Sequence, residues 1–164
     1  MTEEKELELF KYYPNALAHY GEKRAGLSRI WCDDGWYDLI DSLCEQLELL
    51  DNAFGVNVRI TQIKEKYGLL RVYTSVRGKY DDNSRLERLV RDIVSACCHK
   101  TEELSRNICE LTGDTAGTLC QYRGHYKTLS YESSRGNLKY KNFNPISNSV
   151  CEYWYELDKQ KLNG

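Results

Sequence analysis

Residues 108–134 have the layout of a small zinc site from which most ligands are missing. Cys109 is followed three positions later by Thr112, and a glycine-rich, turn-prone stretch then leads to Ser130 and Ser133. A structural zinc site normally takes four Cys or His ligands, supplied as two close pairs from two turns. Ser and Thr hydroxyls are rarely zinc ligands, and one thiolate cannot hold the ion. The sequence therefore predicts neither a metal nor another cofactor in this loop.

Another set of metal ligands would have to come from the other cysteines and histidines. Cys109, Cys120 and His125 lie within one short segment. The further side chains that could approach them are Cys97, Cys98, His99 and Cys151. Adjacent cysteines on a helix point in different directions, which makes Cys97 and Cys98 a poor pair. Because the spacing matches no known type of zinc site, we expect buried, reduced thiols instead.

Catalysis has no positive support in the sequence. The three histidines are His19, His99 and His125. Their positions do not identify a base for a cysteine nucleophile. The acidic residues Asp33, Asp34 and Asp38 fall at a predicted helix start, where the helix dipole favours negative charge. The turn TGDTAG lacks the Gly-Lys-Ser/Thr that contacts phosphate and magnesium. We therefore expect a protein that is not an enzyme.

Basic residues and tyrosines are interleaved in two parts of the chain. The first part contains Lys64, Lys66, Tyr67, Arg71 and Tyr73. The second part, residues 122–141, has five basic residues against one acidic residue, a local balance of +4. Such a mixture suits a single-stranded nucleic acid, and it equally suits a protein interface, where Tyr and Arg are common hot-spot residues. The predicted binding residues are Lys66, Tyr67, Arg71, Arg123, Tyr126 and Tyr131.

The net charge of the whole chain favours a protein partner over a nucleic acid. The formal charge is −2 at pH 7, whereas nucleic-acid-binding domains are usually strongly basic. We therefore expect protein binding, with a single-stranded nucleic acid on the same face as the alternative. An enzyme built on a Cys and His pair is the third hypothesis. A solvated face whose tyrosines only cover the core also fits this composition.

Hydrophobic periodicity predicts the elements that must position these residues. Residues 34–54 carry one apolar stripe at helical period, and residues 84–104 carry another, which Ser84 and Glu87 would open as a capping box. Between them, residues 56–63 and 69–76 alternate with period two, which predicts an antiparallel hairpin. A shorter helix is expected before Pro14. The last segment is compatible with either a helix or a strand.

The predicted architecture is one α+β domain, residues 1–164, in which a small antiparallel sheet packs against two main helices. Residues 1–30 form an N-terminal segment, 31–105 the helix–hairpin–helix core, and 106–164 an irregular, aromatic and partly basic C-terminal region. A small core is expected to replace the zinc in that region. Its predicted members are Ile108, Leu119, Tyr126 and Leu129.

Composition indicates a cytoplasmic protein without a membrane anchor. The chain is 41% apolar and 29% charged, which is ordinary for a globular protein, and its apolar runs are too short to span a bilayer. Seven cysteines, an odd number, and the absence of a hydrophobic N-terminal run argue against a secreted disulfide scaffold.

Three stretches resemble the motifs of an uncharacterised protein family encoded by bacteriophages and bacterial prophages. That family combines a GWxxLIxxLC helix, a KEKFGxLRFY hairpin and a terminal CExCGxxG…TLCxxH element. The corresponding stretches here are GWYDLIDSLC (35–44), KEKYGLLRVY (64–73) and CELTGDTAG with HYKTLSYESS (109–117 and 125–134). The resemblance covers roughly residues 31–134.

This resemblance implies a degenerate zinc ribbon in the C-terminal region. The family's terminal element looks like a zinc-binding ribbon, and of its four ligand positions only Cys109 is kept here. The setting also implies an accessory protein that binds a host protein without catalysis, so inhibiting a host enzyme or a host defence system. Its location would then be the cytoplasm of the host cell.

Overall fold

The protein has the α+β fold that the sequence predicts. The structure is a computed structural model, which describes residues 1–18, 29–78 and 85–162. His19 and Ser84 lie outside the described residues. Within them the chain forms five α-helices and two antiparallel sheets, of two and three strands. The helices are α1 (Glu3–Tyr12), α3 (Tyr37–Phe54), α4 (Arg85–Ser105), α5 (Tyr131–Arg135) and α6 (Asn148–Leu162), and η1 (Asp34–Trp36) is a 3₁₀ turn. The strands are β1 (Asn57–Lys66), β2 (Leu69–Arg77), β3 (Thr118–Tyr122), β4 (His125–Leu129) and β5 (Asn144–Pro145).

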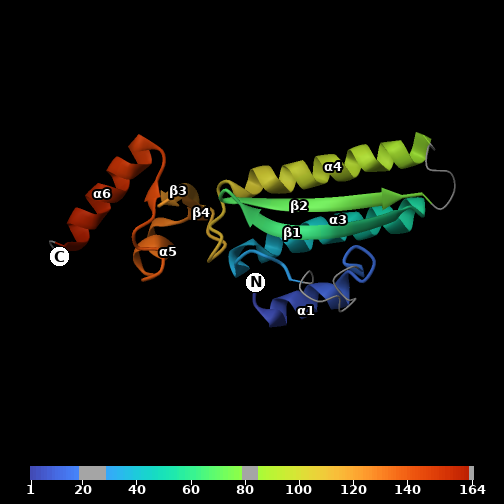
Figure 1. The fold of residues 1–164 in the computed structure, drawn as a ribbon, viewed down its shortest axis with the longest axis horizontal. Helices are drawn as coiled ribbons and strands as arrows, with labels where there is room; N and C mark the ends of the chain where they lie inside the picture. The colour runs from blue at the N-terminus through green and yellow to red at the C-terminus, as the bar shows by residue number, and fades with distance from the viewer. Residues whose placement is uncertain (19–28, 79–84, 163–164) are drawn as a thin grey trace.

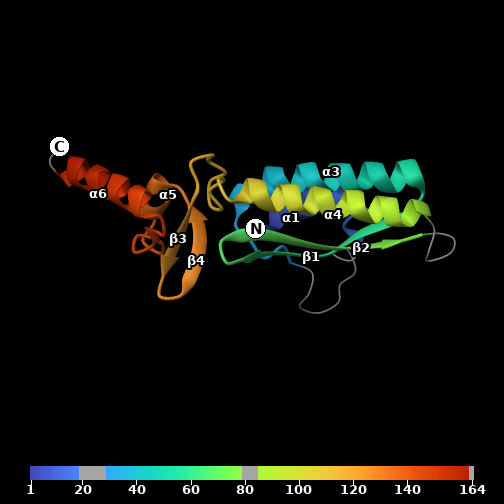
Figure 2. The same cartoon turned by 90° about the horizontal axis from the view of Figure 1, so that it is seen from above.

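Helices α3 and α4 form a layer over one face of the β1–β2 hairpin (Figures 1 and 2). The apolar stripe of α3 is fully buried at Ile40, Leu43 and Leu47. Gly55 ends α3 in the left-handed conformation (φ 61°), where glycine has no steric cost. The predicted arrangement of two main helices on a hairpin is therefore confirmed.

The β1–β2 hairpin is longer than the period-two pattern predicts. Its strands pair from Asn57↔Arg77 to Lys66↔Leu69, so that only Tyr67 and Gly68 remain as the turn. Both turn residues have positive φ (56° and 76°), as a two-residue turn of type I′ requires. A bulge between Ile60 and Gln62 interrupts the register. Residues 64–66, which lie between the two predicted runs 56–63 and 69–76, thus belong to β1 as well.

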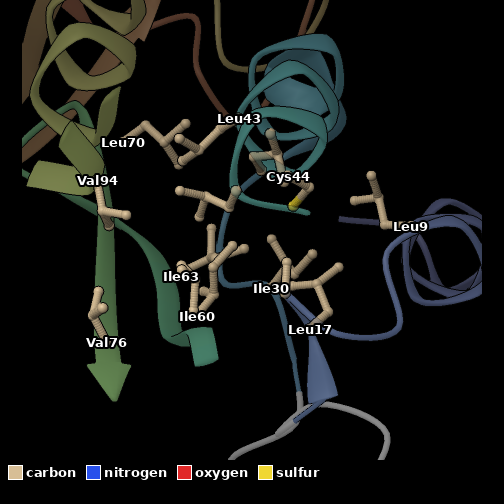
Figure 3. Packing of buried hydrophobic residues seen from close by; sticks show 14 of the residues in the cluster. Leu9, Leu17, Ile30, Leu43, Cys44, Ile60, Ile63, Leu70, Val76 and Val94 are labelled. Carbon is tan, nitrogen blue, oxygen red and sulfur yellow. The ribbon is translucent and has the colours of Figure 1, made fainter. Parts of the chain in front are cut away.

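The main core lies between the helical layer, the hairpin and the N-terminal segment (Figure 3). Its side chains come from every part of residues 1–94 that the structure describes. Leu9 and Leu17 contribute from the N-terminal segment, and Ile30 lies beside β1. The N-terminal segment is therefore part of the core and not an appendage.

The C-terminal region has a second, smaller core. Its sheet has the order β4-β3-β5, and α6 extends beyond it at the end of the molecule (Figure 1). The buried members are Cys109, Cys120, Leu129, Tyr131, Tyr140, Phe143 and Trp154. Of the predicted replacement core only Leu129 is fully buried, since Ile108, Leu119 and Tyr126 are half-buried. Aromatic residues after position 130 fill the space instead.

The last segment is the helix α6 and not a strand. It buries Trp154 and packs Val150 and Leu157 against the small core, a spacing of four and three residues. None of the helices in the described part of the chain has the length and apolar character needed to cross a membrane.

Candidate functional site

A cleft of about 900 Å³ lies between the tip of the β1–β2 hairpin and the C-terminal sheet. Figure 2 shows the hairpin tip beside β4. The side chains that line the cleft include Trp31, Lys66, Tyr67, His125, Tyr126 and Lys139. Tyr140 and Phe143 line it as well, and both are buried. The cleft thus has an aromatic lining with basic side chains among the rings.

The hairpin tip holds Tyr67 in an unusual backbone conformation. A non-glycine residue with φ of 56° costs about 1–2 kcal/mol, and Asn or Gly is the usual choice in such a turn. The side chain of Tyr67 is 64% exposed, and the Lys66 ammonium lies 5.6 Å from its ring centroid. Glu65 supports the turn because its Oε1 accepts a hydrogen bond from the Gly68 N–H at 2.6 Å.

Strand β4 provides the opposite wall. The ring of Tyr126 meets that of Tyr67 edge to face, with 6.0 Å between centroids and an interplanar angle of 81°. This is a favourable geometry for two aromatic rings. His125, the neighbouring residue, is exposed. The hairpin and the C-terminal sheet therefore touch through two tyrosines that both line the cleft.

Three of the six predicted binding residues come together in the cleft, namely Lys66, Tyr67 and Tyr126. The other three lie elsewhere. Arg71 pairs with Glu102 on α4, and Arg123 lies over the Tyr122 ring, 5.1 Å from its centroid. Tyr131 is buried against Trp154 in the small core and donates a hydrogen bond to Asp158 at 2.9 Å.

The exposed cleft residues that sequence reasoning missed include Trp31 and Lys139. Trp31 precedes η1, pairs with Lys64 of β1 through an isolated parallel bridge, and is 58% exposed. No periodic pattern surrounds it in the sequence. Lys139 falls within the basic stretch 122–141, but nothing local distinguishes it from its neighbour Lys141. Both belong to the cleft only because separate segments meet there.

A buried ion pair fixes β4 to the core below the cleft. The Lys127 ammonium lies 2.6 Å from Glu110 Oε1 and 3.1 Å from Asp33 Oδ2. Glu110 is fully buried, and its Oε2 has no hydrogen-bond partner within the described residues. Burial raises the pKa of Glu110 to about 7, although the charge of Lys127 acts in the opposite direction. Burial lowers the pKa of Lys127, but the two carboxylates raise it overall.

Glycines of two sequence motifs allow the C-terminal region to approach the core closely. The Gly35 N–H donates to Glu110 O at 2.8 Å, and the indole N–H of Trp36 donates to Ile108 O at 2.9 Å. A methyl group at Gly35 would lie 2.6 Å from Glu110 O. At the hairpin tip, Thr128 Oγ1 donates to Gly68 O at 2.5 Å. These contacts hold the two walls of the cleft in place.

The four positions that the zinc-ribbon resemblance assigns to ligands lie close together. Cys109 Sγ and Ser133 Oγ are 3.0 Å apart, and Ser130 Oγ donates to Ser133 Oγ at 3.0 Å. The two serines also form the capping box that opens α5. Burial raises the pKa of the Cys109 thiol, but hydrogen bonds with Ser133 and Thr112 bring it below its ordinary value. The loop is thus held by hydrogen bonds between these positions.

The alternative ligand set is not assembled. Cys109 and Cys120 are buried in the small core, whereas His125 is exposed at the cleft. Within residues 1–18, 29–78 and 85–162, no group of three or more His, Cys, Asp or Glu side chains is placed to hold a metal ion. All seven cysteines are free.

Comparison of the chain with protein-family models, with curated proteins and with solved structures found no match.

Proposed function

We propose that the chain is a non-enzymatic accessory protein and that its cleft binds a segment of another protein. The observation that carries this proposal is the pair of facing tyrosines, Tyr67 and Tyr126, in an open cleft with Lys66 beside them. Tyrosine supplies a large, rigid contact area with one polar group, which is why it is common among interface hot spots.

The backbone of Tyr67 supports a binding role. The left-handed conformation at position 67 would be less costly for Gly or Asn, so tyrosine is not the residue that stabilises this turn best. Backbone strain of this kind clusters at sites that bind ligands or partners. The side chain of Tyr67 is largely exposed, and its ring lies against that of Tyr126 on the opposite wall.

The resemblance to bacteriophage and prophage proteins favours a protein of the bacterial host as the partner. Binding at the cleft would then inhibit a host enzyme or a host defence system in the host cytoplasm. The cleft itself supports only the narrower part of this proposal, which is recognition through aromatic and basic side chains.

Site-specific photo-cross-linking tests the proposal. A benzophenone amino acid replaces Tyr67 in one variant and Tyr153, an exposed tyrosine of α6, in the matched control. We expect the variant at position 67 to cross-link one host protein that the control does not capture. Adding Tyr126→Ala should weaken that capture at least about tenfold, as loss of an interface hot spot does. Equal capture at both positions, or none at position 67, would contradict the proposal.

A specific observation favours single-stranded nucleic acid as the second candidate. Lys64 is the sheet neighbour of the exposed Trp31, and its ammonium lies 5.1 Å from the centroid of the exposed Tyr73 ring. Rings on which bases stack, with a cation between them, form a platform for single strands. Binding of a fluorescent oligothymidine should then fall steeply as salt rises and should weaken in Lys64→Glu. Weak binding that is independent of salt would exclude this candidate.

A further inference from the structure

The main chain of β4 has one open position on the edge that faces the cleft. Leu119 O accepts from the Ile146 N–H at 3.0 Å, while Thr128 O, in the register pair Leu119↔Thr128, accepts from the Glu110 N–H at 2.9 Å. The carbonyl groups of this pair therefore point away from each other, outward from the β3–β4 ladder. Outward- and inward-pointing pairs alternate along an antiparallel ladder. The next outward pair is Gln121↔Tyr126.

The two ends of this outward pair have different surroundings. The Gln121 side is covered by β5, which pairs there as Gln121↔Asn144. On the other side, Tyr126 is a lining residue of the cleft. Among the described residues, no turn, loop or side-chain hydrogen bond reaches the main chain of Tyr126. The main chain at Glu110 thus pairs with this edge of β4 at Thr128. The next outward position, Tyr126, remains open.

The carboxylates of the cleft are already engaged. Glu65 accepts from the Gly68 N–H, Asp33 pairs with Lys127, and Glu6 accepts from the Ile30 N–H at 2.9 Å. Asp33 thus has an ion-pair partner, and Glu65 and Glu6 each have a hydrogen-bond partner within the protein.

Three cations that line the cleft, Arg29, Lys66 and Lys139, form no ion pair with a carboxylate among the described residues. The ammonium groups of Lys66 and Lys139 lie 5.6 Å and 4.8 Å from the ring centroids of Tyr67 and Tyr140. The cleft therefore offers positive charge on both walls, next to an open strand edge.

We propose that the occupant of the cleft is an extended, acidic polypeptide segment that adds to the Tyr126 edge of β4 as a short strand. The inference rests on the proposed function. An extended peptide offers both a donor and an acceptor to the main chain of Tyr126, whereas the sugar–phosphate backbone of DNA offers acceptors only. Side chains of an added strand alternate between its two faces, so acidic residues on both faces would meet Lys66 and Lys139 on the two walls.

A random library of short peptides displayed on phage, selected on the immobilised full chain, tests this inference. We expect peptides rich in Asp or Glu and in β-branched residues to be enriched. The free synthetic form of the most enriched peptide should bind the double variant Lys66→Glu, Lys139→Glu about tenfold more weakly than the unaltered chain. The charge-matched control, Lys100→Glu with Lys159→Glu on α4 and α6, should bind as the unaltered chain does.

N-methylation of the peptide, one residue at a time, tests strand addition without altering the protein. A methyl group at the one residue whose N–H reaches the Tyr126 carbonyl should abolish binding, and methyl groups at its two neighbours, whose N–H groups point away from β4, should be tolerated. Equal sensitivity at every position, or binding that both charge-reversed pairs weaken equally, would overturn the inference. So would displacement of the peptide by oligothymidine at lower concentration than by unlabelled peptide.

The two proposals fail in different ways. Enriched peptides that require the cleft but carry basic or neutral residues would overturn the acidic strand and leave protein binding at the cleft intact. An enrichment of no peptide at all would also overturn the acidic strand, while cross-linking from position 67 decides separately whether the cleft binds a protein.

Discussion

Glu110 is held under the cleft by contacts that engage only one of its carboxylate oxygens. Oε1 receives the Lys127 ammonium and, at 3.1 Å, the Asp33 N–H, while Oε2 is buried without a partner in the described chain. A buried carboxylate in this situation is costly when ionised. The pKa of Glu110 is raised for this reason. We therefore expect the stability of the folded protein to depend on pH.

We predict that the protein becomes less stable as the pH rises through neutrality. The pKa of Glu110 is about 7 in the folded state and near 4.5 in the unfolded chain, so the folded protein binds more protons between these values. The stabilisation is complete below about pH 4.5 and is lost as the pH passes 7, on the order of 2–3 kcal/mol. Urea unfolding at about pH 5 and pH 8 measures the change.

Two variants distinguish the contribution of Glu110 to this pH dependence from the contributions of other groups. Burial also raises the pKa of Glu6, which acts in the same direction. Glu110→Gln should therefore flatten most of the dependence, whereas Glu4→Gln, at an exposed position on α1, should leave it unchanged. A wild-type stability that rises between the two pH values would contradict the prediction.

Gly35 is a second residue whose role is local and steric. A methyl group there would lie 2.5 Å from Gly113 N and 2.6 Å from Glu110 O, and closer still to Cys109 O. All three atoms belong to the main chain, which cannot rotate away. Gly35→Ala should lower the free energy of unfolding by about 3 kcal/mol or more.

Gly124→Ala is the control for Gly35→Ala. Gly124 has a positive φ of 83° but open space around its Cα, so alanine should cost only the backbone penalty of about 1–2 kcal/mol. Urea midpoints of the two variants should differ clearly. Equal losses would mean that the contact with residues 109–113 is not tight.

At the scale of elements, the loop from Cys109 to α5 is held by hydrogen bonds between its side chains and with its main chain. Ser130 and Ser133 satisfy main-chain groups at the start of α5, and Thr112 Oγ1 donates to Asp114 Oδ2 at 2.6 Å. Hydroxyl groups thus stabilise turns that, on the zinc-ribbon resemblance, a metal would otherwise hold.

Restoring three cysteines should create a metal site if the resemblance describes this loop. The triple variant Thr112→Cys, Ser130→Cys, Ser133→Cys supplies four thiols within the space that now holds Cys109 and its hydrogen-bonded neighbours. We expect about one zinc per chain by elemental mass spectrometry, and tetrahedral thiolate absorption bands with cobalt. Ser147→Cys with Ser149→Cys, at an exposed pair outside the loop, is the control for adventitious binding. A triple variant that binds no more metal than this control would remove the ribbon interpretation.

The elements could be predicted where one face of a segment is buried along its length. Period 3.6 identifies α3 and α4, and period two identifies β1 and β2, because each pattern follows from contact with a single core. The bulge after Ile60 breaks the alternation, and the tight turn at Tyr67 requires a backbone conformation that tyrosine rarely adopts. For that reason the hairpin extends further than its pattern indicates.

At the scale of the whole molecule, the cleft exists because two separately packed cores meet. Lys66, Tyr67 and Tyr126 could be named from composition, since basic and aromatic residues gather near them in the sequence. Trp31 and Lys139 could not, because their proximity depends on how the C-terminal sheet docks on the hairpin. Tyr131 belongs to the same basic, aromatic stretch yet fills the small core, a distinction that local composition does not contain.

The close approach at Gly35 and Gly68 has a consequence for how such a chain can evolve. Recombination at a boundary near residue 106 would join the N-terminal half of one relative to the C-terminal half of another. The N-terminal half, however, is fitted to the C-terminal one: Gly35 leaves room for the main chain at 109–113, and Gly68 for the side chain of Leu119. A hybrid gene would therefore keep this fit only if the parent of its N-terminal half has glycine at both positions.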